Sequence, residues 1–146
     1  DTYEYLGLAY SDLSNYEKSV ASFTTAVASN PTDMRYLALA QAYFNQGNVE
    51  KAEEYLVRTL NKTRDPAVEK RTRFLLGKIY YESDQYIKAE DQYNKIIESD
   101  PKSADAYYFL GEIFLAYNKA VEARNYWREA SRIDPSHYGA NRRLYD

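Results

Sequence analysis

The sequence of 146 residues predicts an all-α fold made of consecutive pairs of antiparallel helices. Three observations predict it: residue types that recur at fixed offsets, apolar residues at the three- and four-residue spacing of amphipathic helices, and prolines at regular intervals. No stretch shows the strict apolar–polar alternation that is typical of a half-buried strand. A sheet-based fold is therefore not expected.

The recurring residues define four units. Each unit carries a leucine followed by a small residue: Leu6-Gly7, Leu39-Ala40, Leu76-Gly77 and Leu110-Gly111. An aromatic residue follows the small one at the same offset in every unit: Tyr10, Tyr43, Tyr80 and Phe114. A bulky residue follows later, again at one offset: Phe23, Leu56, Tyr93 and Trp127. We expect the two helices of each unit to cross at the small residue, with the bulky side chain beside it.

Breaks in the apolar pattern divide each unit into two helices. The first two units are expected to form helices at residues 1–13 and 16–29, and at 33–45 and 49–62, separated by Leu13-Ser14-Asn15 and by Gln46-Gly47-Asn48. The next two are expected at 67–82 and 86–98, and at 104–117 and 120–132, with a short last helix from 137. Each unit ends at Pro31, Pro66, Pro101 or Pro135. Proline lacks the amide donor and disfavours helix at the residue before it.

These residue slots resemble the tetratricopeptide repeat (TPR), in which an aromatic, Leu-Gly and Tyr are followed by small, aromatic and small residues and a proline. Tyr3, Tyr36 and Tyr107 fill the opening aromatic slot, and Arg73 departs from it. The resemblance implies a right-handed alpha-alpha superhelix, a TPR solenoid forming a single domain over residues 1–146. Its repeats would span about 1–32, 33–66, 67–103 and 104–135, with a capping helix or partial fifth repeat at 137–146 that has a polar outer face.

The resemblance also implies a function. In this family the concave groove, lined by the first helix of each pair, is the usual seat for an extended or helical segment of another protein. Helical geometry then predicts the groove residues: Glu4, Leu8, Asp12, Leu37, Gln41, Phe44, Asn45, Arg71, Phe74, Lys78, Tyr81, Glu82, Tyr108, Glu112 and Leu115. Their mixture of aromatic, apolar and polar side chains suits peptide recognition. The alternative is that the aromatic residues only seal adjacent repeats.

Composition argues against several other functions. Without cysteine the chain has no thiolate metal site and no cysteine nucleophile, and its single histidine, His137, is expected to be a solvated surface residue. We therefore expect no enzymatic activity, no metal and no cofactor. Because 22 acidic and 19 basic residues are interspersed, with a net charge of -3, nucleic acid is not an expected partner. No apolar run approaches the roughly 20 residues that membrane insertion requires.

Two other functions remain open at this point. As alternatives to the groove-binding scaffold, the chain would be a self-assembly module that forms homo-oligomers, or the docking domain of a larger enzyme or envelope-assembly protein. Residues 1–10 lack the basic start and apolar core of a signal peptide, and both a cytoplasmic and a periplasmic location fit the sequence.

Overall fold

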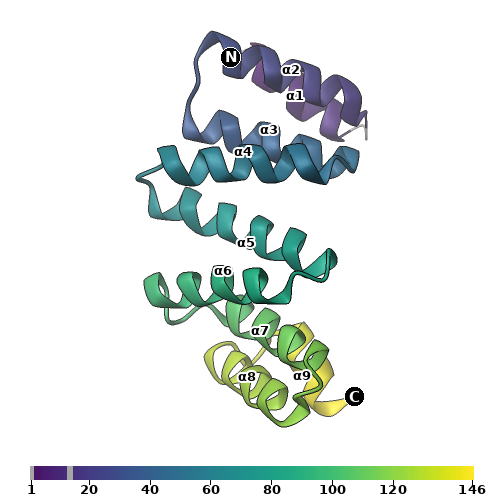
Figure 1. Ribbon diagram of the computed structural model, residues 1–146, viewed down its shortest axis with the longest axis vertical. Helices are drawn as coiled ribbons and strands as arrows, with labels where there is room; N and C mark the ends of the chain where they lie inside the picture. The colour runs from purple at the N-terminus through teal and green to yellow at the C-terminus, as the bar shows by residue number, and fades with distance from the viewer. Residues whose placement is uncertain (1, 13–14) are drawn as a thin grey trace. The chain divides into compact units, whose positions relative to one another are not determined.

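The computed structural model describes residues 2–12 and 15–146, and only the backbone of Asp12. These residues form nine α-helices and no strand (Figure 1). The helices are α1 (Thr2–Asp12), α2 (Tyr16–Ser29), α3 (Asp33–Gln46), α4 (Val49–Lys62), α5 (Pro66–Glu82), α6 (Tyr86–Ser99), α7 (Ala104–Ala116), α8 (Ala120–Ile133) and α9 (Tyr138–Tyr145). Leu13 and Ser14, in the first predicted break, lie outside the described residues. The predicted all-α fold class is confirmed.

The helices form two compact structural units, residues 1–72 and 73–146, each of which is larger than one repeat. We refer to these two as units and to the four segments found in the sequence as repeats. The first unit holds α1 to α4 and the start of α5, and the second holds the rest of α5 and α6 to α9. The single domain over residues 1–146 stays a prediction.

In the first unit, α1 packs against α2, α2 against α3, and α3 against α4. A Cβ atom added to Gly7 would lie 2.7 Å from the ring of Phe23, so α1 and α2 cross where the sequence predicts. Phe23, Leu39 and Ala42 are buried together at the centre of the unit. The second repeat carries Ala40 and Leu56 in the same two slots, and both are fully buried.

In the second unit the same crossing occurs twice. A Cβ atom on Gly77 would lie 2.5 Å from the ring of Tyr93, and one on Gly111 would overlap the ring of Trp127. Glycine is required at these two positions because the ring occupies the space of any side chain. Trp127 lies in a buried cluster that α9 joins through Ala140. The last helix therefore packs on the fourth repeat as the sequence predicts.

The breaks between paired helices share one backbone feature. Gly47, Asp84 and Asn118 stand at the same position in three successive repeats and have positive φ angles of 89°, 61° and 61°. Glycine, and to a lesser degree asparagine and aspartate, adopt this left-handed conformation without a large steric cost. The polar breaks thus end the first helix of the second, third and fourth pairs.

The prediction that His137 is a solvated residue is wrong. Its side chain is only 11% exposed, and Nε2 lies 2.7 Å from Oδ1 of Asp105. Its Nδ1 accepts a hydrogen bond of 3.1 Å from the backbone N–H of Ala140, so the imidazole caps α9. The first amides of a helix need an acceptor, and the sequence supplies this one from a histidine. No three potential metal-ligating side chains converge within the described ranges.

The outer face of α9 is less polar than predicted. Tyr138 and Tyr145 are both exposed, seven residues apart on one face of the helix, and Arg142 lies between them in sequence and is also exposed. The last helix therefore presents aromatic as well as charged side chains to solvent. None of the helices in residues 2–12 and 15–146 is both long and apolar enough to span a bilayer.

Candidate functional site

The first unit contains a cleft of about 480 Å³, which we call the α1–α3 cleft. Helices α1 and α3 line most of it, together with Phe23 of α2 and Arg71 at the start of α5. Six predicted groove residues meet there: Glu4, Leu8, Leu37, Gln41, Asn45 and Arg71. Phe44 is half-buried and does not line the cleft, and the side chain of Asp12 lies outside the described part of the chain. The register of the first helices thus brings residues from three helices to one surface.

The α1–α3 cleft is mainly apolar and has polar groups at defined points. The side chains of Tyr5, Leu8 and Met34 are exposed, whereas Leu37 is 3% exposed and forms the floor. The Gln41 side chain donates a hydrogen bond of 3.0 Å from Nε2 to Oδ1 of Asn45, which leaves their other amide groups for a ligand. Arg71 is exposed, and its guanidinium can donate two hydrogen bonds to a carboxylate.

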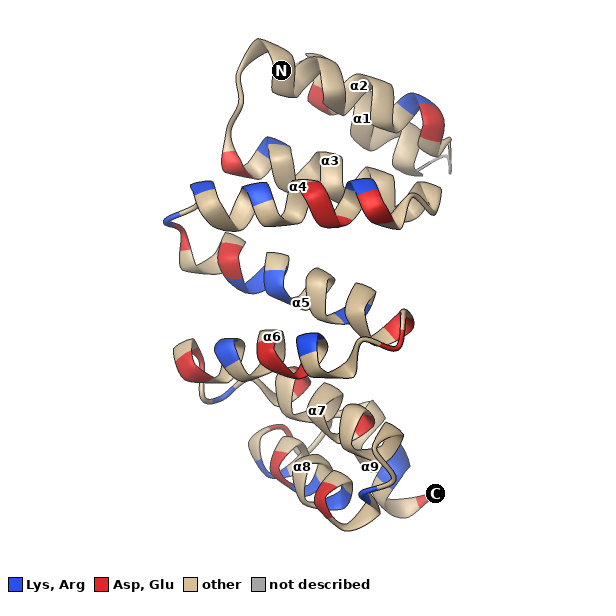
Figure 2. Cartoon of the chain, viewed as in Figure 1, with Lys and Arg blue, Asp and Glu red and all other residues tan. Residues whose placement is uncertain are grey.

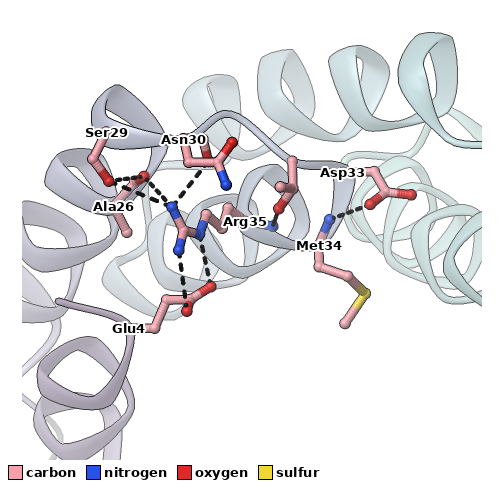
Figure 3. A network of polar contacts seen from close by, with 8 residues as sticks. Glu4, Ala26, Ser29, Asn30, Asp33, Met34 and Arg35 are labelled. Carbon is pink, nitrogen blue, oxygen red and sulfur yellow. Dashed lines mark hydrogen bonds and ion pairs between the residues drawn. The ribbon is translucent and has the colours of Figure 1, made fainter. Parts of the chain in front are cut away.

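Glu4 contributes to this cleft through an arginine that the sequence analysis does not single out. Nε of Arg35 donates a hydrogen bond of 2.9 Å to Oε1 of Glu4 (Figure 3). Nη1 of the same arginine donates to the backbone oxygens of Ala26, at 2.9 Å, and Asn30, at 3.1 Å, where α2 ends. Arg35 lowers the pKa of the Glu4 carboxyl. Arg35 therefore ties α1, the end of α2 and α3 together, and the Glu4 carboxylate is already engaged.

The second unit has a smaller cleft of about 260 Å³, the α5–α7 cleft. It is lined by Lys78, Tyr81, Glu82, Tyr93, Tyr108, Phe109 and Glu112, five of which are predicted groove residues. Leu115 and Phe74 do not line it. The Phe74 ring packs 6.0 Å from that of Tyr93 and 6.3 Å from that of Phe109. Phe74 thus supplies the aromatic packing that Arg73 cannot provide.

Glu112 is engaged in the same way as Glu4. Arg143 of α9 donates two hydrogen bonds to its carboxylate, of 2.8 Å from Nε and 2.6 Å from Nη2. Burial, followed by the charge of Glu112, raises the pKa of Tyr108 and of Tyr81. In both units a predicted groove carboxylate bonds to an arginine 31 residues later. That spacing is the one signal in the sequence from which the two pairs could have been found.

The comparisons with known proteins agree with this architecture. A family pattern described as a tetratricopeptide repeat-like domain matches residues 2–143. The chain belongs to this TPR family. The resemblance stated from the sequence is confirmed, and the helices of the described residues fit TPR repeats followed by a cap.

Solved structures show the same fold. The TPR chain superposes on a crystal structure of MamA with a TM-score of 0.81 and 19% identity, over 95% of this chain and 80% of that one. It superposes on YrrB, described as a TPR protein with an unusual peptide-binding site, with a TM-score of 0.82 and 21% identity, over 96% and 71%. It superposes on a TPR protein from Parabacteroides merdae with a TM-score of 0.79 and 17% identity, over 97% of this chain and 57% of that one.

Membership of the TPR family indicates the general class of function. TPR proteins are generally scaffolds without catalytic activity, and the match supports a protein-interaction scaffold. Acidic and basic residues are interspersed along α4 and α8 (Figure 2), as the sequence predicts.

Proposed function

We propose that this TPR chain is a scaffold that binds a segment of another protein in the α1–α3 cleft. The observation that carries the proposal is the exposed apolar group of Tyr5, Leu8 and Met34 beside the amides of Gln41 and Asn45. Exposed apolar surface that surrounds convergent polar groups is typical of interaction sites. YrrB, which shares the fold, is described as having a peptide-binding site, and this supports the same class of ligand here.

The chemistry of the cleft suggests what the bound segment carries. Apolar side chains of the segment would contact Leu8 and Met34, and its backbone would pair with the amides of Gln41 and Asn45. A carboxylate on the segment would meet Arg71, which is exposed at the edge of the cleft. We therefore propose a segment with apolar anchors and at least one acidic residue, in an extended or a helical conformation.

Replacement of Leu8 with aspartate tests the proposal. Peptides are first selected on the wild-type chain from a random library, and their affinities are measured by fluorescence anisotropy. We expect Leu8→Asp to weaken binding by about tenfold or more, because the substitution puts a charge among the apolar contacts. The melting temperature should change little, because Leu8 is 55% exposed in the free chain.

The matched control is Val121→Asp, which introduces the same charge at a residue that is 72% exposed on α8 and lies outside the α1–α3 cleft. It should bind the selected peptides as the wild type does. Selected peptides that bind the Leu8 variant as tightly as the Val121 variant would remove the α1–α3 cleft from the proposal.

A second candidate function is self-assembly, which the exposed tyrosines of α9 favour. An aromatic outer face on the last helix is suited to packing on a second copy of the chain. If it does so, light scattering should show concentration-dependent dimers or larger forms that disappear when Tyr138 and Tyr145 are both changed to serine. A chain that stays monomeric at all concentrations would argue against self-assembly and leave the scaffold proposal intact.

A further inference from the structure

The fourth repeat carries an aromatic pocket that shares no residue with either cleft. Tyr107 and Phe114 of α7 and Tyr126 of α8 line this pocket of about 380 Å³, together with Glu122, Asn125 and Glu129. The Tyr126 ring lies 6.4 Å from that of Tyr107 and 5.0 Å from that of Phe114. All three rings are half-buried. We call this site the α7–α8 aromatic pocket.

In the three other repeats, the chain places one of its own cations over an aromatic ring, which stands at the register of Phe114 in the first and third repeats and of Tyr126 in the second. Lys18 Nζ lies 5.5 Å from the ring centroid of Tyr10, and Lys88 Nζ lies 5.4 Å from that of Tyr80. In the second repeat, Arg58 Cζ lies 5.0 Å from the ring centroid of Tyr55. These distances are within the range of a cation–π interaction. Each of these repeats thus supplies a positive charge to its own aromatic surface.

The fourth repeat reverses the charge at both positions. Its Glu122 stands at the register where the earlier repeats have Lys18, Lys51 and Lys88. Its Glu129 stands at the register of Arg58. On α8 the two carboxylates come four residues before and three residues after Tyr126, so all three side chains share one face of the helix. The fourth repeat therefore places negative charge beside Tyr126, where the second repeat has Arg58 over the equivalent Tyr55.

The carboxylates and the rings are only partly engaged by the chain. Glu129 pairs with Arg132 on the same helix, which lowers the pKa of its carboxyl and keeps it ionised at neutral pH. Glu122 is exposed, and no ion pair engages its carboxylate within the described part of the chain. Lys119 Nζ lies 5.7 Å from the Phe114 ring centroid but does not line the pocket. The rings of Tyr107 and Tyr126 therefore stay partly exposed beside the side chains of Glu122 and Glu129.

We propose that the α7–α8 aromatic pocket binds a lysine side chain of another polypeptide. The faces of aromatic rings carry negative electrostatic potential and attract an ammonium group, and the two carboxylates add to that attraction. The occupant follows from the chain itself, because the other repeats hold cations at these registers. Lysines stand at the register of Glu122, two of them over the ring equivalent to Phe114, and Arg58 lies over the ring equivalent to Tyr126. The proposal is independent of the α1–α3 cleft.

The test uses a lysine whose amino and carboxyl ends are blocked, with blocked norleucine as the uncharged probe of similar length. Each is titrated into the chain with labelled tyrosines, and the ring signals of Tyr107 and Tyr126 are followed by NMR after assignment with the Tyr→Phe variants. We expect saturable shifts of these two rings with lysine and none with norleucine. Glu122→Gln should weaken lysine binding by about fivefold, the loss expected for one close charge in water.

Glu122→Lys should abolish the shifts, because it restores the arrangement of the other repeats and fills the pocket from within. Glu98→Lys makes the same change of charge on an exposed position of α6 and should bind lysine as the wild type does. Equal shifts with norleucine, no shift with lysine, or unchanged lysine binding by the Glu122→Lys variant would each overturn the proposal.

Discussion

Replacement of Gly111 with alanine is expected to destabilise the second unit by about 2–3 kcal/mol. Alanine ordinarily stabilises a helix relative to glycine by about 1 kcal/mol, so the predicted sign is opposite to that of helix propensity. The reason is steric: a Cβ atom at this position overlaps the indole of Trp127, which is buried in the core. A rigid, buried ring cannot move aside without disturbing its neighbours. Urea denaturation followed by circular dichroism measures the change.

The second repeat shows which substitution should make Gly111→Ala stabilising instead of destabilising. There the small slot holds Ala40 and the bulky slot holds Leu56, where the other repeats pair glycine with a ring. Trp127→Leu alone should cost about 3 kcal/mol through lost packing. In that background, Gly111→Ala should become neutral or stabilising, because the ring that causes the overlap is gone.

The two substitutions therefore form a double-mutant cycle with a favourable coupling energy of about 1–3 kcal/mol. Gly47→Ala is not a suitable control, because Gly47 has a positive φ that strains any side chain. Ser99→Ala, at the exposed end of α6, is a better one and should change stability by less than about 0.5 kcal/mol. Additive effects at Gly111 and Trp127 would show that the two residues do not share the crossing.

The sequence predicted the helices and their crossings because both depend on local information. Apolar periodicity sets the helix bounds, and the internal repeat identifies Gly7, Gly77 and Gly111 beside their rings without any knowledge of the tertiary structure. The register of each first helix also placed Leu8 and Gln41 in one cleft, because side-chain direction follows from position along a helix.

The sequence did not show which groove residues the fold already uses. Glu4 and Glu112 bond to arginines on another helix, and that contact depends on how far apart two helices lie and how each is rotated. Leu37 lies at the floor of its cleft for the same reason, since periodicity gives the direction of a side chain but not its depth. His137 caps α9 because Asp105 and Tyr108 surround its ring. Such contacts follow from tertiary packing.

Replacement of Arg35 with methionine should destabilise the first unit by about 2–3 kcal/mol. Methionine keeps the length of the side chain but removes the hydrogen bonds to Glu4, to Ala26 and to Asn30. Arg35 is only 11% exposed, so water cannot fully replace the lost partner of Glu4 or of the two backbone oxygens at the end of α2. Urea denaturation at neutral pH gives the loss directly.

The matched control is Arg132→Met on α8. Arg132 also pairs with a glutamate, but it is 69% exposed and the pair lies within one helix. Exposed pairs of this kind contribute little, so the control should leave the stability nearly unchanged. Equal losses in the two variants would show that Arg35 does not join α1, α2 and α3.

The pH dependence separates the ion pair from the other contacts of Arg35. Arg35 lowers the pKa of Glu4 from its ordinary value of 4.5, so the folded state binds this proton less tightly than the unfolded state does. The stability that the pair contributes is therefore fully present above pH 4.5 and is lost as the pH falls through the lowered pKa. The Arg35→Met variant lacks this contribution, and its stability should fall less steeply with acidification than that of the wild type. Hydrogen bonds to Ala26 and Asn30 involve no titrating acceptor, so a loss that is the same at every pH would assign the effect of Arg35 to the end of α2 alone.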